Sequence, residues 1–111
     1  MRLVPENHPT REVGFASARA LSEWNAAMSG ELELMARELD RLTHRPLDRG
    51  QNPRRTHPLR PPLDKKTIGA VALPLWQQEI TASGRLWYCP DKSTLRVWVV
   101  KVSLRHPKET D

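Results

Sequence analysis

The sequence predicts a small α+β domain in which an N-terminal strand and a helical hairpin pack on an antiparallel β-meander. Three observations predict it: a helical apolar period over residues 18–44, an alternating pattern rich in β-branched and aromatic residues after residue 66, and short turns between the later segments. A chain of 111 residues has room for a single domain, so we assign residues 1–111 to one unit.

The first half of the chain predicts a lead-in, a strand and two helices. Residues 1–10 contain two prolines and predict a flexible lead-in, and residues 11–15 predict a short strand. Apolar residues then recur every three or four positions, which is the period of one helical face: Leu21, Trp24, Met28, Leu32, Met35, Leu39 and Leu42. Gly30 costs about 1 kcal/mol relative to alanine inside a helix, so we expect helices at 17–28 and 31–44, with one long helix as the alternative.

Residues 45–66 predict a basic loop rich in proline and arginine. Five of the ten prolines lie between Pro46 and Pro62, and proline removes a backbone donor and excludes helix. Strands are then expected at 68–73 and 75–81, at 85–89 after a turn at 82–84, and at 94–104 after a turn at 90–93. A loop this long in so small a domain is usually functional or disordered.

Positive charge is concentrated in that loop. Residues 1–40 carry 4 basic and 7 acidic residues, whereas residues 41–66 carry 8 basic and 2 acidic residues. The chain has a formal charge of +5, and arginine outnumbers lysine 13 to 5. Clustered arginines bind phosphate groups well and raise the local potential, so a polyanion or an acidic partner is expected. A genome rich in G and C would also explain the arginine excess.

Several classes of site are not expected. The single Cys89 excludes an internal disulfide and a cysteine-based zinc site, and we interpret it as a half-buried small apolar residue rather than a nucleophile. The four histidines show no metal-ligand spacing, and no glycine-rich phosphate loop is present. We therefore expect a cytoplasmic domain with no metal, no cofactor, no signal peptide and no membrane span.

Two groups of residues have the chemistry of metal-free RNA cleavage. Arg85 opens a strand, and Arg105 and His106 follow the last strand, so neighbouring antiparallel strands could bring them together near the loop arginines Arg54, Arg55 and Arg60. Arginine neutralises charge on a phosphate, and histidine or lysine moves a proton. Ordinary solvated charges at strand ends are the competing interpretation.

The tryptophans predict packing more than binding. Trp24 lies on the helical stripe, and Trp76, Trp87 and Trp98 fall on successive strands, where a packed column between sheet and helices is expected. Base stacking by one of these three is the alternative.

Residues 75–81 (LWQQEIT), 84–88 (GRLWY) and 95–100 (LRVWVV) resemble the C-terminal half of the RelE/ParE toxin superfamily. The ending at 105–111 is similar to that of actinobacterial members. The resemblance implies a toxin of a type II toxin–antitoxin system. In the RelE-like branch such toxins are ribosome-dependent endoribonucleases that cut mRNA without metal, by attack of a 2′-hydroxyl group on the adjacent phosphate.

The resemblance also implies roles for individual residues. Arg85 matches the strand arginine that contacts the scissile phosphate, and Arg105 and His106 fall where such toxins stabilise charge or transfer a proton. The residues expected to bind RNA are Arg54, Arg55, Arg60, Lys65, Lys66 and Lys108. Glu79 is a further candidate. The chain departs from the pattern because no tyrosine follows the last strand, and Tyr88 is its only tyrosine.

The resemblance implies partners as well. These are mRNA, the ribosome and a cognate antitoxin, expected to be acidic and encoded by an adjacent gene. The same superfamily contains ParE-like inhibitors of DNA gyrase, which share the fold and have no catalytic residues, so a gyrase inhibitor is the main alternative. An inactive relative that only binds an antitoxin or RNA is a third possibility.

Overall fold

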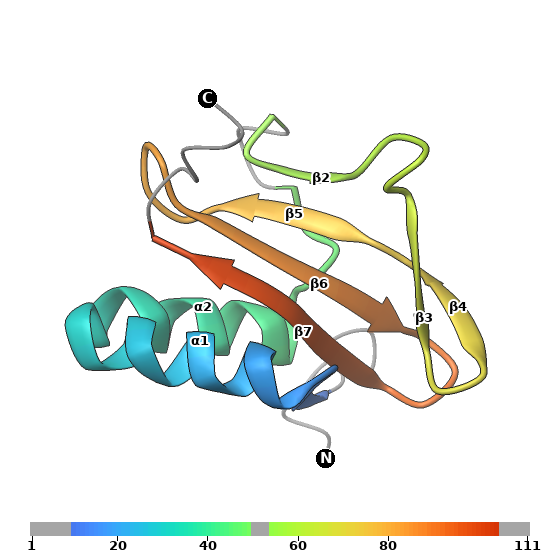
Figure 1. The fold of residues 1–111 in the computed structure, drawn as a ribbon, viewed down its shortest axis with the longest axis horizontal. Helices are drawn as coiled ribbons and strands as arrows, with labels where there is room; N and C mark the ends of the chain where they lie inside the picture. Colours follow the sequence, from blue (N-terminus) through green and yellow to red (C-terminus); the bar gives the residue numbers. More distant parts are fainter. Residues whose placement is uncertain (1–9, 50–53, 105–111) are drawn as a thin grey trace, which may run out of the picture.

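Two helices cover one face of a five-stranded sheet, and a β-hairpin extends from the sheet (Figure 1). The computed structural model describes residues 10–49 and 54–104. It confirms an α+β domain in which two helices pack on a largely antiparallel sheet. None of the helices in these ranges is both long and apolar enough to cross a membrane.

The helical hairpin follows the first strand. After β1 (Glu12–Phe15), α1 (Ala18–Gly30) begins at Ser17, whose Oγ accepts a hydrogen bond from Ala20 N–H at 3.0 Å. The helix ends at Glu31, where the backbone leaves helical geometry, and α2 (Leu32–His44) follows directly. The expectation of two helices is confirmed, and the alternative of one long helix is wrong.

The main sheet has the order β1-β7-β6-β5-β2. Three strands that follow one another in the chain, β5 (Trp76–Glu79), β6 (Arg85–Asp91) and β7 (Arg96–Ser103), form the expected antiparallel meander. The short strand β2 (Thr56–Pro58) adds to β5 in antiparallel orientation, whereas β1 pairs with β7 in parallel. The sheet is therefore mixed, which the sequence did not predict.

Two predicted boundaries are wrong. The expected loop at 45–66 contains β2 and the start of a second hairpin, β3 (Lys65–Ile68) and β4 (Val71–Pro74), and its residues 50–53 lie outside the described part. The expected strand at 68–73 is interrupted by the turn of this hairpin. Gly69 adopts a φ of +63°, a left-handed conformation that glycine takes without steric cost, and this reverses the chain.

The turn expected at 90–93 also starts too early, because β6 continues to Asp91. Pro90 pairs with Val97 of β7, but the pairing with β5 stops at Tyr88, so within the described part of the chain Pro90 has no ladder partner on its other side. A proline, which lacks the amide donor, is tolerated at such a position.

The main core lies between the helices and the sheet. It consists of buried residues from both helices and from the helix-facing positions of the strands: Ala20, Trp24, Ala27, Met35, Leu42, Ile80, Leu86, Tyr88, Val97, Val99 and Val102. Trp24 is in this core, as expected. Each large apolar side chain buried here contributes about 1.5–3 kcal/mol.

Tyr88 is the polar member of this core, and its partners satisfy it. Its hydroxyl donates to Pro46 O at 2.6 Å and accepts from Arg41 Nη1 at 3.3 Å. The Arg41 guanidinium lies 5.1 Å from the centre of the Tyr88 ring and pairs with Glu38 at 3.1 Å. Burial raises the pKa of Tyr88 above its ordinary value, so the phenol is neutral in the folded protein.

A second apolar cluster lies under the β3–β4 hairpin on the opposite face of the sheet. Leu73, Leu75 and Cys89 are its buried members, and Trp87 and Trp98 pack against it. Trp76 instead joins the helix-facing core, so the expected single column of three tryptophans is wrong. The reason is the pleat, which turns successive side chains of a strand to opposite faces.

Candidate functional site

The sheet face opposite the helices carries two rows of polar and aromatic side chains, which lie beside and beyond the part that the β3–β4 hairpin covers. The strand residues of each row are directly paired with one another, so their side chains share one face. Arg55 lies in the turn just before β2, and its backbone carbonyl accepts a hydrogen bond from Glu79 N–H. The first row is Arg55, Glu79, Arg85 and Ser103. The second row is His57, Gln77, Trp87 and Lys101. Four strand segments therefore bring together residues up to 48 positions apart in the chain.

The first row places an arginine beside a carboxylate. Arg85 Nη2 lies 3.6 Å from Glu79 Oε1, and Arg85 Nη1 donates to Gly84 O at 2.9 Å. Arg55 Nη2 donates to the backbone carbonyl of Glu79 at 3.0 Å. The Arg85 and Glu79 side chains remain 25% and 33% exposed, so both groups are held in place and still reach solvent.

The turn before β6 fixes the position of Arg85, the first residue of that strand. Gly84 N–H donates to Thr81 Oγ1 at 2.7 Å. A Cβ atom at Gly84 would lie 2.5 Å from Thr81 Oγ1 and 3.2 Å from Ser103 O, so only glycine fits between this turn and the end of β7. The close approach sets the register in which Arg85 lies opposite Ser103.

The second row combines an imidazole, an amide, an indole and an ammonium group. Trp87 Nε1 donates to Gln77 Oε1 at 2.8 Å, which fixes the indole against β5. Lys101 Nζ lies 5.6 Å from the centre of the Trp87 ring on the other side. His57 Nδ1 lies 2.9 Å from Pro58 O, and in the tautomer that donates this bond the Nε2 atom is left as the acceptor.

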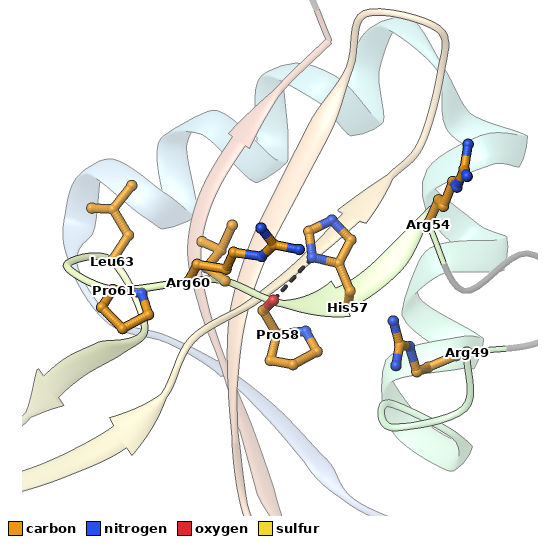
Figure 2. Close-up of a pocket in the computed structure, with 8 residues that line it drawn as sticks. Arg49, Arg54, His57, Pro58, Arg60, Pro61 and Leu63 are labelled. Carbon is orange, nitrogen blue, oxygen red and sulfur yellow. Dashed lines mark hydrogen bonds between the residues drawn. The ribbon is translucent and has the colours of Figure 1, made fainter.

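His57 also lines an open basic hollow of about 790 Å³ around β2 (Figure 2). The hollow has three arginines and apolar walls, and its lining is Arg49, Arg54, His57, Pro58, Leu59, Arg60, Pro61 and Leu63. Figure 2 shows the Arg60 side chain extending toward the His57 ring. Arg49 Nε donates to Thr56 O at 3.0 Å, which anchors this side chain to β2. Guanidinium groups spaced around a hollow suit a chain of phosphates.

The predicted loop arginines therefore divide between two places. Arg55 belongs to the first row, whereas Arg54 and Arg60 line the basic hollow. His57 belongs both to the lining of this hollow and to the second row. Lys66, on the hairpin, lines a smaller hollow with Trp87 and Lys101.

Lys65 is exposed on the hairpin. The remaining predicted site residues, Arg105, His106 and Lys108, lie outside the described residues.

Cys89 packs as a small apolar residue, as expected, but it is more deeply buried than the half-buried position predicted from the sequence. It is fully buried in the apolar cluster under the hairpin. Burial raises the pKa of its thiol to about 11, which the Lys66 ammonium opposes only in part. The thiol is therefore protonated at neutral pH and does not serve as a nucleophile.

Sequence reasoning missed His57, Gln77 and Lys101 as site residues. Successive side chains along 76–79 and 85–88 point to alternate faces, so each strand has two faces. This pattern does not say which residue of one strand pairs with which residue of the next. That depends on register, and the register shifts between Trp87 and Tyr88 through an irregularity in the β6–β7 pairing.

Within the part of the chain that the structure describes, no group of three or more His, Cys, Asp or Glu side chains could hold a metal ion. Comparisons with protein-family models, with curated proteins and with solved structures return no match to this chain.

Proposed function

We propose that this protein is a type II toxin of the RelE/ParE superfamily that cleaves mRNA on the ribosome without a metal ion. The observation that carries the proposal is the pair of rows on the open sheet face, where Arg85, a carboxylate and an imidazole come from neighbouring strands. The residue pattern at 75–100 resembles that superfamily, and the order of a strand, two helices and a β-meander is compatible with its fold.

Metal-free RNA cleavage needs three groups. A base accepts the proton of the 2′-hydroxyl as its oxygen attacks phosphorus, a cation stabilises the charge on the phosphorane, and an acid protonates the departing 5′-oxygen. The products are a 2′,3′-cyclic phosphate and a 5′-hydroxyl. In this proposal Arg85 stabilises the phosphorane, and Glu79 and His57 are the described groups able to transfer protons. Arg105 and His106 are assigned the same kind of role by resemblance.

Primer extension on a defined mRNA in translating ribosomes tests the proposal. We expect new 5′ ends at A-site codons with the purified protein. Arg85→Ala should lower the cleavage rate about 100–1,000-fold, because one charge-stabilising donor contributes that much to such reactions. Arg37→Ala is the matched control, since Arg37 is exposed on α2, and it should cleave normally.

Two outcomes contradict the proposal. One is intact mRNA under conditions in which the protein still arrests growth. The other is undiminished cleavage by an Arg85→Ala variant whose circular dichroism and unfolding curve match those of the parent protein.

A ParE-like gyrase inhibitor is the second candidate. The observation that favours it is the position of the single tyrosine: Tyr88 is fully buried and its hydroxyl donates to Pro46 O, so it does not reach the open face. Growth arrest with DNA-damage signalling and no mRNA cleavage would support this candidate over the nuclease.

Both candidates require an antitoxin. The arginines around the basic hollow and Arg85 give this face a positive charge that suits an acidic partner. Co-expression with the product of the adjacent gene should abolish growth arrest and yield a stable complex. Arrest that persists with every neighbouring gene product would argue against a toxin–antitoxin pair.

A further inference from the structure

We propose that the small hollow beside Trp87 binds one nucleobase of a single-stranded RNA, stacked on the indole. This inference rests on the proposed function in taking RNA as the ligand, and it adds a base-binding position that the resemblance does not supply.

The hollow has a volume of about 260 Å³ and lies where α1 meets the edge of β7. Trp87 and Val100 form its apolar wall, and Ser17 lies at the start of α1. It exists because β1 ends at Phe15, opposite Val99, so that, among the described residues, no strand lies beside the second half of β7 on that edge. This volume is close to the lower end of the range for small-ligand pockets.

The indole of Trp87 is held in a fixed position, with Lys101 Nζ 5.6 Å from the centre of the ring. Its only polar atom, Nε1, already donates to Gln77 Oε1 at 2.8 Å. The ring therefore has no further hydrogen bond to make, and the part that lines the hollow offers aromatic surface alone. A fixed, half-exposed aromatic ring is what single-stranded nucleic acids use as a stacking platform.

The charges around the hollow favour a phosphodiester chain. Glu23 is the acidic lining group, but its Oε2 pairs with Arg19 at 3.3 Å and its Oε1 accepts from Val102 N–H at 2.9 Å. Among the residues that the structure describes, no carboxylate pairs with Lys66 or Lys101, the two lysines of the lining. An aromatic wall together with two lysines fits a flat base and its flanking phosphates, whereas an acidic peptide would use only the lysines.

The hollow also lies near the proposed cleavage site along β6. Trp87 and Arg85 lie two residues apart on β6, with their side chains on one face, which separates them by about 6.6 Å along the strand. A base stacked on Trp87 would therefore belong to the nucleotide whose phosphate, or neighbouring phosphate, reaches Arg85.

Fluorescence anisotropy with a labelled 2′-O-methyl RNA pentamer tests the inference, because this RNA cannot be cleaved. The comparison ligand is an abasic pentamer with the same phosphates. Trp87→Ala should weaken binding of the first ligand about 5- to 150-fold and leave binding of the abasic one unchanged. Trp98→Ala is the matched control, since Trp98 is on the same face beside Arg96, at the other end of β7, and it should bind both ligands normally.

Trp87→Phe covers the case in which the alanine variant fails to fold. Tryptophan emission of the parent protein should fall when the 2′-O-methyl pentamer binds, and Trp87→Phe should lose this quenching while keeping most of the affinity. Equal affinity of the parent protein for the two pentamers would overturn the inference, as would unchanged binding by a folded Trp87→Ala variant.

These results separate the two proposals. Cleavage of mRNA by the parent protein, combined with Trp87-independent binding, would overturn the stacking site and leave the nuclease standing. Trp87-dependent binding with no cleavage would support the stacking site and contradict the nuclease.

Discussion

The two faces of the sheet are built for different tasks although they share the same strands. Along β6, Leu86 and Tyr88 are fully buried against the helices, whereas Arg85 and Trp87 alternate with them on the opposite face. The helix-facing side is closed along its length by apolar packing. The opposite side is closed only where the β3–β4 hairpin covers it. Buried apolar packing is therefore concentrated on one face, and the open half of the other is where we propose binding and chemistry.

The largest expected effect separates the two faces directly. Leu86→Ala should lower the free energy of unfolding by about 2–5 kcal/mol, because it leaves a cavity at a site with no exposed surface. Arg85→Ala, one residue away, should change it by less than about 1 kcal/mol, because its ion pair is partly exposed. Urea denaturation of both variants measures this. Equal losses would mean that the open face also holds the fold together.

The part of the sheet that the hairpin covers should make the protein less stable in alkaline solution, because it contains the buried thiol of Cys89. The pKa of Cys89 is raised to about 11 by burial, from about 9 in the unfolded chain. A raised folded-state pKa gives a contribution that is complete below pH 9 and is lost as the pH rises to 11 and beyond. We expect a loss of about 2–3 kcal/mol across this window. Tyr88, whose pKa is also raised, adds to it above pH 10.

Comparing Cys89→Ala with the parent protein gives the contribution of the thiol alone, because Tyr88 is present and ionises in both proteins. The variant should lose less stability than the parent protein between pH 9 and 11, as measured by denaturation at several pH values. Parallel pH profiles for the two proteins would show that the hairpin does not keep water from Cys89.

The smallest expected effect is the loss of stability from a substitution in the turn of the β3–β4 hairpin. Gly69→Ala should cost about 1–2 kcal/mol, because Gly69 has a φ of +63° and no atom lies within 4 Å of the added Cβ, so the cost is backbone strain alone. Gly30→Ala is the matched control, with equally open space and no positive φ, and it should be neutral or slightly stabilising. Thermal unfolding of both variants compares them. An equally tolerated Gly69→Ala would mean that the turn relaxes freely.

The sequence was sufficient for elements whose signal is local. The helices follow from the apolar stripe and the break near Gly30, and Arg85 was correctly placed at the start of a strand. Elements that depend on partners were missed. The parallel pairing of β1 with β7, the turn at Gly69 and the continuation of β6 through Pro90 arise from which strands meet.

The candidate site was only partly predictable for the same reason. Arg55 and Arg85 were named from residue type and position, and they meet at Glu79. His57 was one of four scattered histidines in the sequence. Its place beside Gln77 comes from β2, a three-residue strand inside a segment whose prolines indicated a loop.

The most direct test of the division between faces is chemical-shift mapping. A 2′-O-methyl RNA pentamer is titrated into the isotope-labelled protein and two-dimensional NMR spectra are recorded. We predict shifts at His57, Gln77, Arg85, Trp87 and Lys101 and at the start of α1, which borders the small hollow, with the outer positions of α2 unchanged. Shifts centred on the helices, with the two rows unaffected, would contradict the account.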